Sequence, residues 1–154
     1  MSLRVGIGYD SHRLAEGESL VIGGVEIEHD RGLAGHSDAD VLTHAVIDAL
    51  LGSCGLGDLG QLFPSEEEQW RNADSFDLLR VVVGKLPGSP LNVDATLICE
   101  QPKLSPHRAE MESALGRVLS APVSVKATTN DTMGAIGRGE GIACIAVALV
   151  ETGE

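Results

Sequence analysis

The stretch RVGIGYDSHRL, Arg4 to Leu14, decides the fold, because an apolar run typical of a first strand ends there in an acid and an imidazole. The strand is predicted over LRVGIGY, residues 3–9, and Asp10 and His12 follow it two positions apart. If the extended conformation continues through both residues, their side chains point to one face of the sheet. The pair could then share one metal ion.

A helix is predicted over residues 37–51, where Ser37 and Asp40 resemble a capping box and two glycines follow the last apolar residue. His44 lies four residues after Asp40 and four before Asp48, so these three polar residues share one helix face. The opposite face is apolar and carries Val41, Leu42, Ala45, Val46 and Ala49.

Asp10, His12 and His44 together offer one carboxylate oxygen and two imidazole nitrogens, a ligand set that suits Zn²⁺. Three protein ligands leave a fourth position open, as in catalytic rather than structural zinc sites. Asp40 or Asp48 could accept the far N–H of a ligating His44. The alternative is that residues 10–12 form a turn and that His44 is a surface or satisfied histidine, and spacing alone leaves both readings open.

The remaining pattern predicts a mixed-sheet α+β domain over residues 1–154 rather than a doubly wound one, because two helices follow each other and a hairpin stands near the N-terminus. The hairpin turns at Gly23-Gly24. Asp74 and Ser105 are candidate helix N-caps, and Pro87 marks a helix end. The further expected strands are 19–29 (a hairpin pair), 91–99, 123–129 and 141–151. The further expected helices are 72–88 and 105–121, and the candidate binding loops are 55–70 and 126–141.

Charge and composition narrow the possible partners. Eleven Lys and Arg residues against 23 Asp and Glu residues give a formal net charge of −12. This charge disfavours binding of nucleic acid. A phosphate ligand would need local cations or metal ions to overcome the repulsion. No targeting or membrane segment is evident, so we expect no membrane partner and a cytoplasmic protein, or a plastid one if a transit peptide was removed. The apolar last strand suits burial within the domain or against another subunit.

Three further segments are candidate anion sites. His36 and Ser37 precede a predicted helix, and Lys103 and Arg108 surround the start of another, where backbone N–H groups favour phosphate. Simple helix caps are the alternative at both places. The Gly- and Thr-rich loop 126–141 could approach phosphates, with Asp131 as a possible Mg²⁺ ligand.

Taken together, these segments resemble one family, the 2-C-methyl-D-erythritol 2,4-cyclodiphosphate synthases of the non-mevalonate isoprenoid pathway. The similarity spans nearly the whole chain. It rests on GYDSHRL (8–14), GHSDADVLTHAVIDALLG (35–52), LGDLGQLFP (56–64), DATLICEQPKLSPH (94–107) and VKATTNDTMGAIGRGEGIACIAVALV (125–150).

The resemblance implies a chorismate-mutase-like homotrimer with active sites between subunits and Zn²⁺ held by Asp10, His12 and His44. By the same carry-over His36 and Ser37 contact a substrate phosphate, and Thr128 and Thr129 hold the diphosphate. Asp58, Gly60 and the Phe63-Pro64 loop line the sugar and erythritol region, and residues 99–105 line the cytidine pocket. His36 and Thr129 support the transition state. The implied substrate-binding positions are Asp10, His12, His36, Ser37, Asp58, Gly60, Phe63, Pro64, Cys99, Pro102, Lys103, Leu104, Ser105, Thr128, Thr129 and Arg138.

The implied reaction is intramolecular. The 2-phosphate of 4-diphosphocytidyl-2-C-methyl-D-erythritol 2-phosphate attacks the β-phosphorus, CMP leaves, and a cyclic diphosphate forms with Zn²⁺ and Mg²⁺ or Mn²⁺ as Lewis acids and templates. Asp131 stands where many relatives have Glu. Ala135 stands where many relatives have a bulky aromatic residue, beside an apolar cavity along the trimer axis whose mouth matches Arg138 and Glu140. A metal-dependent phosphohydrolase and a non-catalytic metal- or isoprenoid-phosphate-binding trimer are the competing hypotheses.

Overall fold

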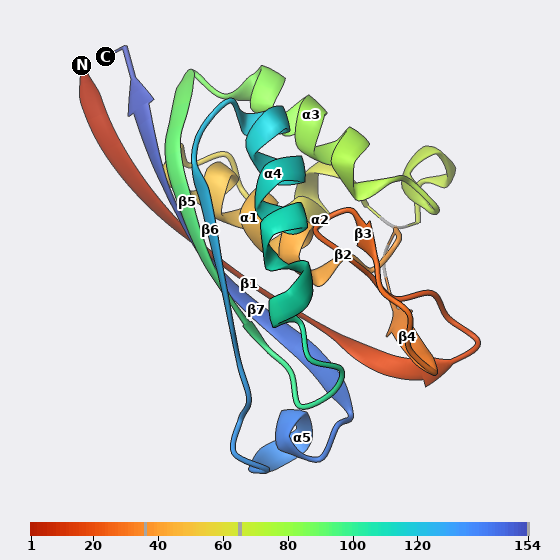
Figure 1. The fold of residues 1–154 in the computed structure, drawn as a ribbon. Coiled ribbons are helices and arrows are strands. Elements are labelled where there is room, and N and C mark those ends of the chain that lie inside the picture. The colour runs from red at the N-terminus through yellow and green to blue at the C-terminus, as the bar shows by residue number, and fades with distance from the viewer. Residues whose placement is uncertain (36, 65, 154) are drawn as a thin grey trace.

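The computed structural model describes residues 1–35, 37–64 and 66–153. Within these residues a five-stranded sheet forms one layer of the fold, and three longer helices cover one of its faces (Figure 1). The strands are β1 (Ser2–Glu16), β4 (Arg31–Ala34), β5 (Gly88–Ile98), β6 (Val123–Thr128) and β7 (Gly141–Thr152), and the helices are α1 (Val41–Ser53), α3 (Ser75–Lys85) and α4 (Arg108–Leu119).

The sheet is mixed, as the sequence predicts. Its strand order is β4–β1–β7–β5–β6. β5 and β6 run parallel, whereas β1 pairs antiparallel with β4 and β7, and β7 pairs antiparallel with β5. A fold with helices on one face of such a sheet is α+β, so the predicted fold class is confirmed.

β1 extends well past the predicted residues 3–9 and reaches Glu16. Gly6 and Gly8 therefore share their face with Asp10 and His12, as the alternation of a strand requires. That face is turned toward α1. A Cβ atom on either glycine would lie 1.9 Å from a carbonyl oxygen of α1, so only glycine lets the helix approach this closely.

α1 differs from the amphipathic helix that the sequence predicts, because it is buried on nearly all sides, with Asp40 at 0% and His44 at 3% exposed. The helix packs between the sheet and the other helices, which leaves no solvent-facing polar side. Its N-cap is Asp40, whose side chain accepts from the Thr43 N–H, so the predicted capping box at Ser37 is wrong. Ser37 instead adopts a left-handed φ of 60° in the turn before the helix.

The shorter elements agree with the sequence in part. β2 (Val21–Ile22) and β3 (Val25–Glu26) form the expected hairpin about Gly23-Gly24, and Asp74 caps α3 as predicted. Loop 55–70 contains α2 (Leu59–Leu62) and the 3₁₀ turn η1 (Glu68–Trp70). Ser105 is not an N-cap, because it begins the 3₁₀ turn η2 (Ser105–His107), which leads into α4. The loop after β6 holds α5 (Gly134–Gly137).

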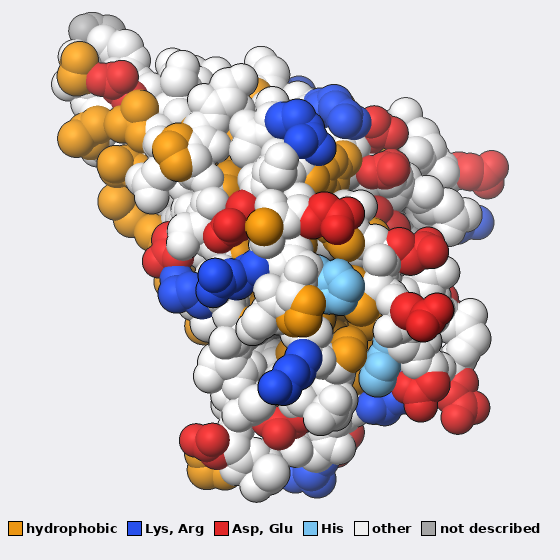
Figure 2. All heavy atoms as spheres, in the orientation of Figure 1, with side chains coloured by type: hydrophobic (Ala, Val, Ile, Leu, Met, Phe, Trp, Pro, Cys, Tyr) orange, Lys and Arg blue, Asp and Glu red, His pale blue; other side chains and the backbone are white. Residues whose placement is uncertain are grey.

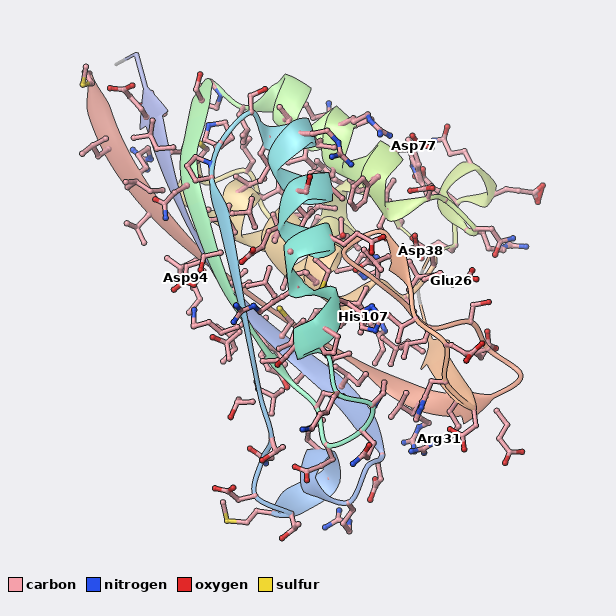
Figure 3. The ribbon with its side chains drawn as sticks, in the orientation of Figure 1. Glu26, Arg31, Asp38, Asp77, Asp94 and His107 are labelled. Carbon is pink, nitrogen blue, oxygen red and sulfur yellow. The ribbon has the colours of Figure 1, made fainter. Side chains whose placement is uncertain are left out.

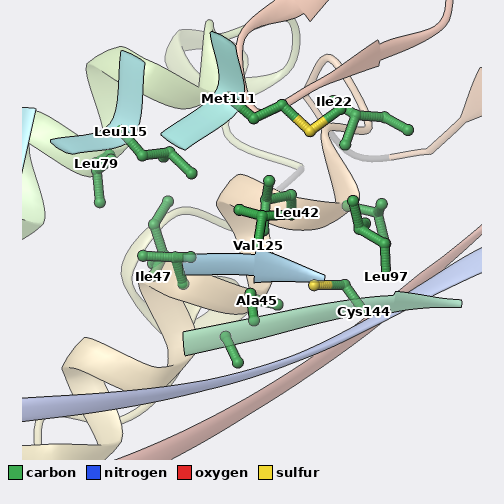
Figure 4. Packing of buried hydrophobic residues seen from close by; sticks show 14 of the residues in the cluster. Ile22, Leu42, Ala45, Ile47, Leu79, Leu97, Met111, Leu115, Val125 and Cys144 are labelled. Atoms are coloured by element: carbon green, nitrogen blue, oxygen red, sulfur yellow. The ribbon is translucent and has the colours of Figure 1, made fainter. Parts of the chain in front are cut away.

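Aliphatic side chains fill the space between the sheet and the helices (Figure 4). Leu42 and Ile47 of α1, Leu115 of α4 and Leu97 of β5 are all fully buried. The three cysteines are free thiols, of which Cys99 and Cys144 are buried and Cys54 is half-buried. Burial raises the pKa of the Cys144 thiol, which behaves as a small apolar core residue.

The other face of the sheet is open and apolar. β1 contributes Leu3, Val5, Ile7 and Tyr9, each more than half exposed, and β7 adds Ile145 and Val147, 39% and 41% exposed. Figure 2 shows hydrophobic side chains gathered at the corner where β1 begins. The last strand is therefore buried on one face only within this chain. No helix in the described ranges is both long and apolar enough to cross a membrane.

Candidate metal and substrate site

The metal site predicted from the sequence is assembled where β1 crosses α1. His12 Nε2 lies 2.6 Å from Asp10 Oδ2, and His44 Nδ1 lies 3.2 Å from each of these two atoms. Among the described residues, these three form the one cluster whose ligand atoms could hold a metal ion. The strand through residues 10–12 continues, so the alternative of a turn there is wrong.

The spacing of the three ligand atoms fits a zinc ion. Ligands at about 2.0–2.1 Å in tetrahedral directions lie about 3.3 Å apart, and both His44 separations of 3.2 Å match that distance. The shorter Asp10–His12 contact is a hydrogen bond that a bound metal would replace. His44 is almost fully buried, whereas about a quarter of the Asp10 side chain is exposed, so the site opens toward solvent on the Asp10 side.

Asp10 is held in its charged form. Burial by itself raises the pKa of this carboxyl, but hydrogen bonds and charge interactions with His12 and His44 outweigh burial and lower the pKa. An ionised carboxylate is the form that binds a cation. The triad therefore includes an ionised carboxylate among its candidate ligand atoms.

The residue that contacts the far ring nitrogen of His44 is neither Asp40 nor Asp48. Its Nε2 lies 3.0 Å from Ser75 Oγ, at the start of α3. Asp40 instead accepts from the backbone N–H groups of Gly23 and Gly24, and from Thr43. Asp48 accepts from the Leu59 N–H and so fixes α2 to α1. Both predicted partners of His44 are thus structural residues, and that prediction is wrong.

The residues predicted to bind cytidine line a cavity of about 550 Å³. Its lining consists of Cys99, Glu100, Gln101, Pro102, Lys103, Leu104, Ser105, Pro106, Ala127, Thr128 and Thr129. The Cys99 thiol donates to the carbonyl of Gln101, and burial raises its pKa to about 11, so it stays protonated at neutral pH. Within the described chain, none of the three metal-ligand residues lines this cavity, so one chain presents the two parts separately.

The two segments that line the cavity are tied to each other by Glu100, a residue of the motif 94–107 for which the sequence predicts no individual role. Glu100 Oε2 accepts from the Asn130 N–H at 2.6 Å, which links the end of β5 to the loop after β6. Thr128 and Thr129 are exposed at the start of that loop, and Thr129 Oγ1 accepts from the Asp131 N–H. Both threonines line the cavity, and the diphosphate-binding role that the resemblance implies for them stays a prediction.

The other predicted substrate residues occupy varied surroundings. Asp58 is the N-cap of α2, which includes Gly60. The Phe63 ring is buried edge-on against Trp70, at 4.9 Å between centroids, and the adjoining Pro64 is half-buried. Arg138 Nε donates to Glu140 Oε2 at 2.8 Å within one chain.

Two of the predicted roles, those of His36 and Asp131, stay predictions. His36, the predicted catalytic and phosphate-binding histidine, lies outside the described residues. Asp131 is exposed with a left-handed φ of 53° and is not part of the Asp10–His12–His44 cluster, so its role as a Mg²⁺ ligand stays a prediction.

The fold and the triad together define a candidate metal-dependent enzyme, and the comparisons with known proteins identify its family. The YgbB family model matches residues 3–151, and the chain belongs to this family. The 2-C-methyl-D-erythritol 2,4-cyclodiphosphate synthase of Salinibacter ruber is 54% identical, over 97% of this chain and 99% of that protein. The resemblance predicted from the motifs is therefore confirmed.

Two solved structures share the fold closely. A 2C-methyl-D-erythritol-2,4-cyclodiphosphate synthase in a CDP-bound form superposes with a TM-score of 0.87 at 35% identity, and the match covers 96% of this chain and all of that one. The bifunctional IspDF protein of Campylobacter jejuni gives a TM-score of 0.92 at 35% identity, over 98% of this chain. The chain spans 42% of that longer protein.

Proposed function

We propose that this chain converts 4-diphosphocytidyl-2-C-methyl-D-erythritol 2-phosphate to 2-C-methyl-D-erythritol 2,4-cyclodiphosphate and CMP. An oxygen of the 2-phosphate attacks the β-phosphorus, the bond from that phosphorus to the oxygen bridging to the α-phosphorus breaks, and CMP carries that oxygen away. The expectation of an enzyme that forms a cyclic diphosphate is confirmed by the names of the relatives. The observation that carries the assignment to these atoms is the Asp10–His12–His44 triad. Residues 1–154 act as one domain in this proposal.

The chemistry requires a flexible and highly anionic substrate to bend until two of its phosphates meet. Binding the cytidine end in the cavity of residues 99–106 and 127–129 would fix one end of the molecule. Lys103 adds positive charge there, and the hydroxyls of Thr128 and Thr129 donate to phosphate oxygens. Ser37 and His36 would hold the 2-phosphate at the other end.

The triad residues would hold Zn²⁺, which fits their donor atoms and spacing. When bound, such an ion neutralises phosphate charge as a Lewis acid and orients the reacting groups. Mg²⁺ or Mn²⁺ on the substrate diphosphate, with Asp131 as a candidate contact, is the second proposed ion. These cations also overcome the repulsion between a polyphosphate and a chain of net charge −12.

We further infer that the active sites lie between subunits of a homotrimer. The open apolar face of the sheet supports assembly, because an exposed patch of this kind usually marks a contact surface. The separation of the cytidine cavity from the metal triad also supports it, since a neighbouring subunit could bring the two parts together. Light scattering at several protein concentrations measures the mass of the assembly directly.

³¹P NMR of the purified protein with the proposed substrate, Zn²⁺ and Mg²⁺ tests the reaction. A coupled pair of cyclic diphosphate resonances together with CMP is the expected result. CMP with two uncoupled monophosphate signals would instead identify a phosphohydrolase that uses water. Unchanged substrate with bound metal would support the non-catalytic binding protein.

A further inference from the structure

Ser75 joins the metal ligand His44 to a carboxylate that no part of the proposed reaction uses. Ser75 is the first residue of α3 and is fully buried. Its Oγ lies 3.0 Å from His44 Nε2 and makes a short hydrogen bond to Asp38 Oδ1. Asp38 lies beside the start of α3 (Figure 3), and its other oxygen accepts from the Ser75 N–H at 3.0 Å.

The direction of these hydrogen bonds follows from Asp38. An ionised carboxylate only accepts hydrogen bonds, so the Ser75 hydroxyl must donate its one hydrogen to Asp38. The Ser75 oxygen can then only accept from His44, and the neutral imidazole of His44 must carry its proton on Nε2. Asp38 itself is 3.9 Å from that nitrogen, beyond hydrogen-bond range, so the hydroxyl is the link between them.

The other side of the imidazole is consistent with this direction. His12 Nε2 is 2.6 Å from Asp10 Oδ2 and donates to it. His44 Nδ1 lies only 3.2 Å from the same His12 nitrogen, so a proton on both atoms would bring two N–H groups face to face. Because Asp10 could also accept from a protonated Nδ1, the ring has two competing tautomers. In the tautomer protonated on Nδ1, the proton occupies the lone pair that a metal ion would bind.

We propose that Ser75 is a positioning residue that holds His44 as the Nε2–H tautomer, with the Nδ1 lone pair directed at the metal position. The metal-binding part of this inference rests on the proposed function. Asp38 also connects these contacts to the turn that bears Ser37, because the Asp38 N–H donates to Ser37 Oγ at 2.6 Å while the Ser37 hydroxyl donates to the Ala73 carbonyl. Ser75 thereby links the metal ligand to the turn proposed to bind the 2-phosphate.

The first test uses metal-free protein and needs no activity. ¹⁵N NMR of the histidine rings distinguishes a protonated from an unprotonated ring nitrogen. For His44 we expect a protonated Nε2 and an unprotonated Nδ1 in the neutral ring. The opposite tautomer in the wild-type protein would overturn the inference, whether or not the protein binds zinc.

The second test measures zinc affinity by competition with a chelator. Ser75→Ala should weaken zinc binding by about 10- to 100-fold, the usual cost of losing an outer partner of a ligating histidine. Ser75→Thr keeps the hydroxyl and should restore most of the affinity. Asp74→Ala is the matched control, because it removes the cap of the same helix, a bond to the Phe76 N–H, without touching His44.

The outcomes separate the two proposals. Wild-type zinc affinity in a folded Ser75→Ala protein would overturn the positioning role while leaving the metal centre intact. An equal loss in Asp74→Ala would also overturn it, because the loss would then report the start of α3 rather than the hydroxyl. A wild-type protein that binds no zinc would refute the metal centre, and the tautomer measurement would still decide the role of Ser75.

Discussion

The backbone of Gly8 lies directly beneath that of Ala45, so that a Cβ atom on Gly8 would come within 1.9 Å of the Ala45 carbonyl oxygen. Gly6 has the same relationship to Ala49, one helical turn further on. These two contacts set the height of α1 above β1. They also set the distance between His44, which neighbours Ala45, and Asp10, which follows Gly8 on the same strand face.

Gly8→Ala should therefore destabilise the protein by about 3 kcal/mol or more, because α1 cannot move without disturbing the core beneath it. Zinc affinity should fall as well. Chemical denaturation and a chelator titration measure the two effects. Gly52→Ala is the control in the same interface, since its Cβ would meet only Ile7 O at an ordinary 3.7 Å, and equal losses in both variants would contradict the explanation.

His44→Ala should remove most of the bound zinc and nearly all cyclase activity, because two of three ligands hold the ion poorly. Metal analysis and the ³¹P assay check this, with circular dichroism to confirm the fold. His29→Ala, outside the triad, should retain both metal and activity. Normal turnover in metal-free His44→Ala protein would exclude the zinc assignment.

Lys103→Ala should weaken CMP binding more than it affects stability, because this lysine lines the cavity of about 550 Å³ and belongs to no buried cluster. Calorimetry with CMP measures the affinity. Lys85→Ala removes a lysine from α3 instead and should leave CMP affinity unchanged. If both variants bind CMP like the wild type, Lys103 is not a pocket residue.

Asp40→Ala should cost about 2–4 kcal/mol of unfolding free energy, because one side chain caps α1 and also accepts from the Gly23 and Gly24 N–H groups. Asp74→Ala removes a single exposed cap bond and should cost about 1 kcal/mol. Urea denaturation at one protein concentration compares the two variants. A cost for Asp40→Ala no larger than that for Asp74→Ala would show that the hairpin contacts contribute little.

The lowered pKa of Asp10 predicts a pH dependence in the metal-free protein. Because the folded pKa lies below the ordinary value of 3.8, the ionised carboxylate stabilises the fold above that value, and this stability is lost as the pH falls through the folded pKa. Denaturation midpoints of wild type and Asp10→Asn should therefore converge in acid. Burial raises the pKa of Asp40 in both proteins alike, so its effect cancels in the comparison. A constant difference down to acid pH would contradict the assignment.

The sequence predicts the fold class and the hairpin from its apolar patterning, and strand alternation places Asp10 and His12 on one face. Spacing along the chain leaves open whether His44 joins them, and the resemblance to a known family points to that set of three. It does not predict that α1 is buried all round, since that burial depends on α3 and β7, which lie far along the chain. Ser75 escapes notice for the same reason. It follows a helix cap and stands 31 positions from His44, and only the packing of α3 against α1 brings the two together.

The position of β7 in the sheet bears on how the protein is made. This strand runs from Gly141 to Thr152, yet it lies between β1 and β5 and pairs with Ser2 through Arg13. During synthesis β1 therefore leaves the ribosome well before β7, its central partner. Contacts of such long sequence separation form slowly, so the backbone of β1 lacks its β7 partner while the rest of the chain is made. A chaperone that binds extended apolar segments has its longest opportunity at this strand.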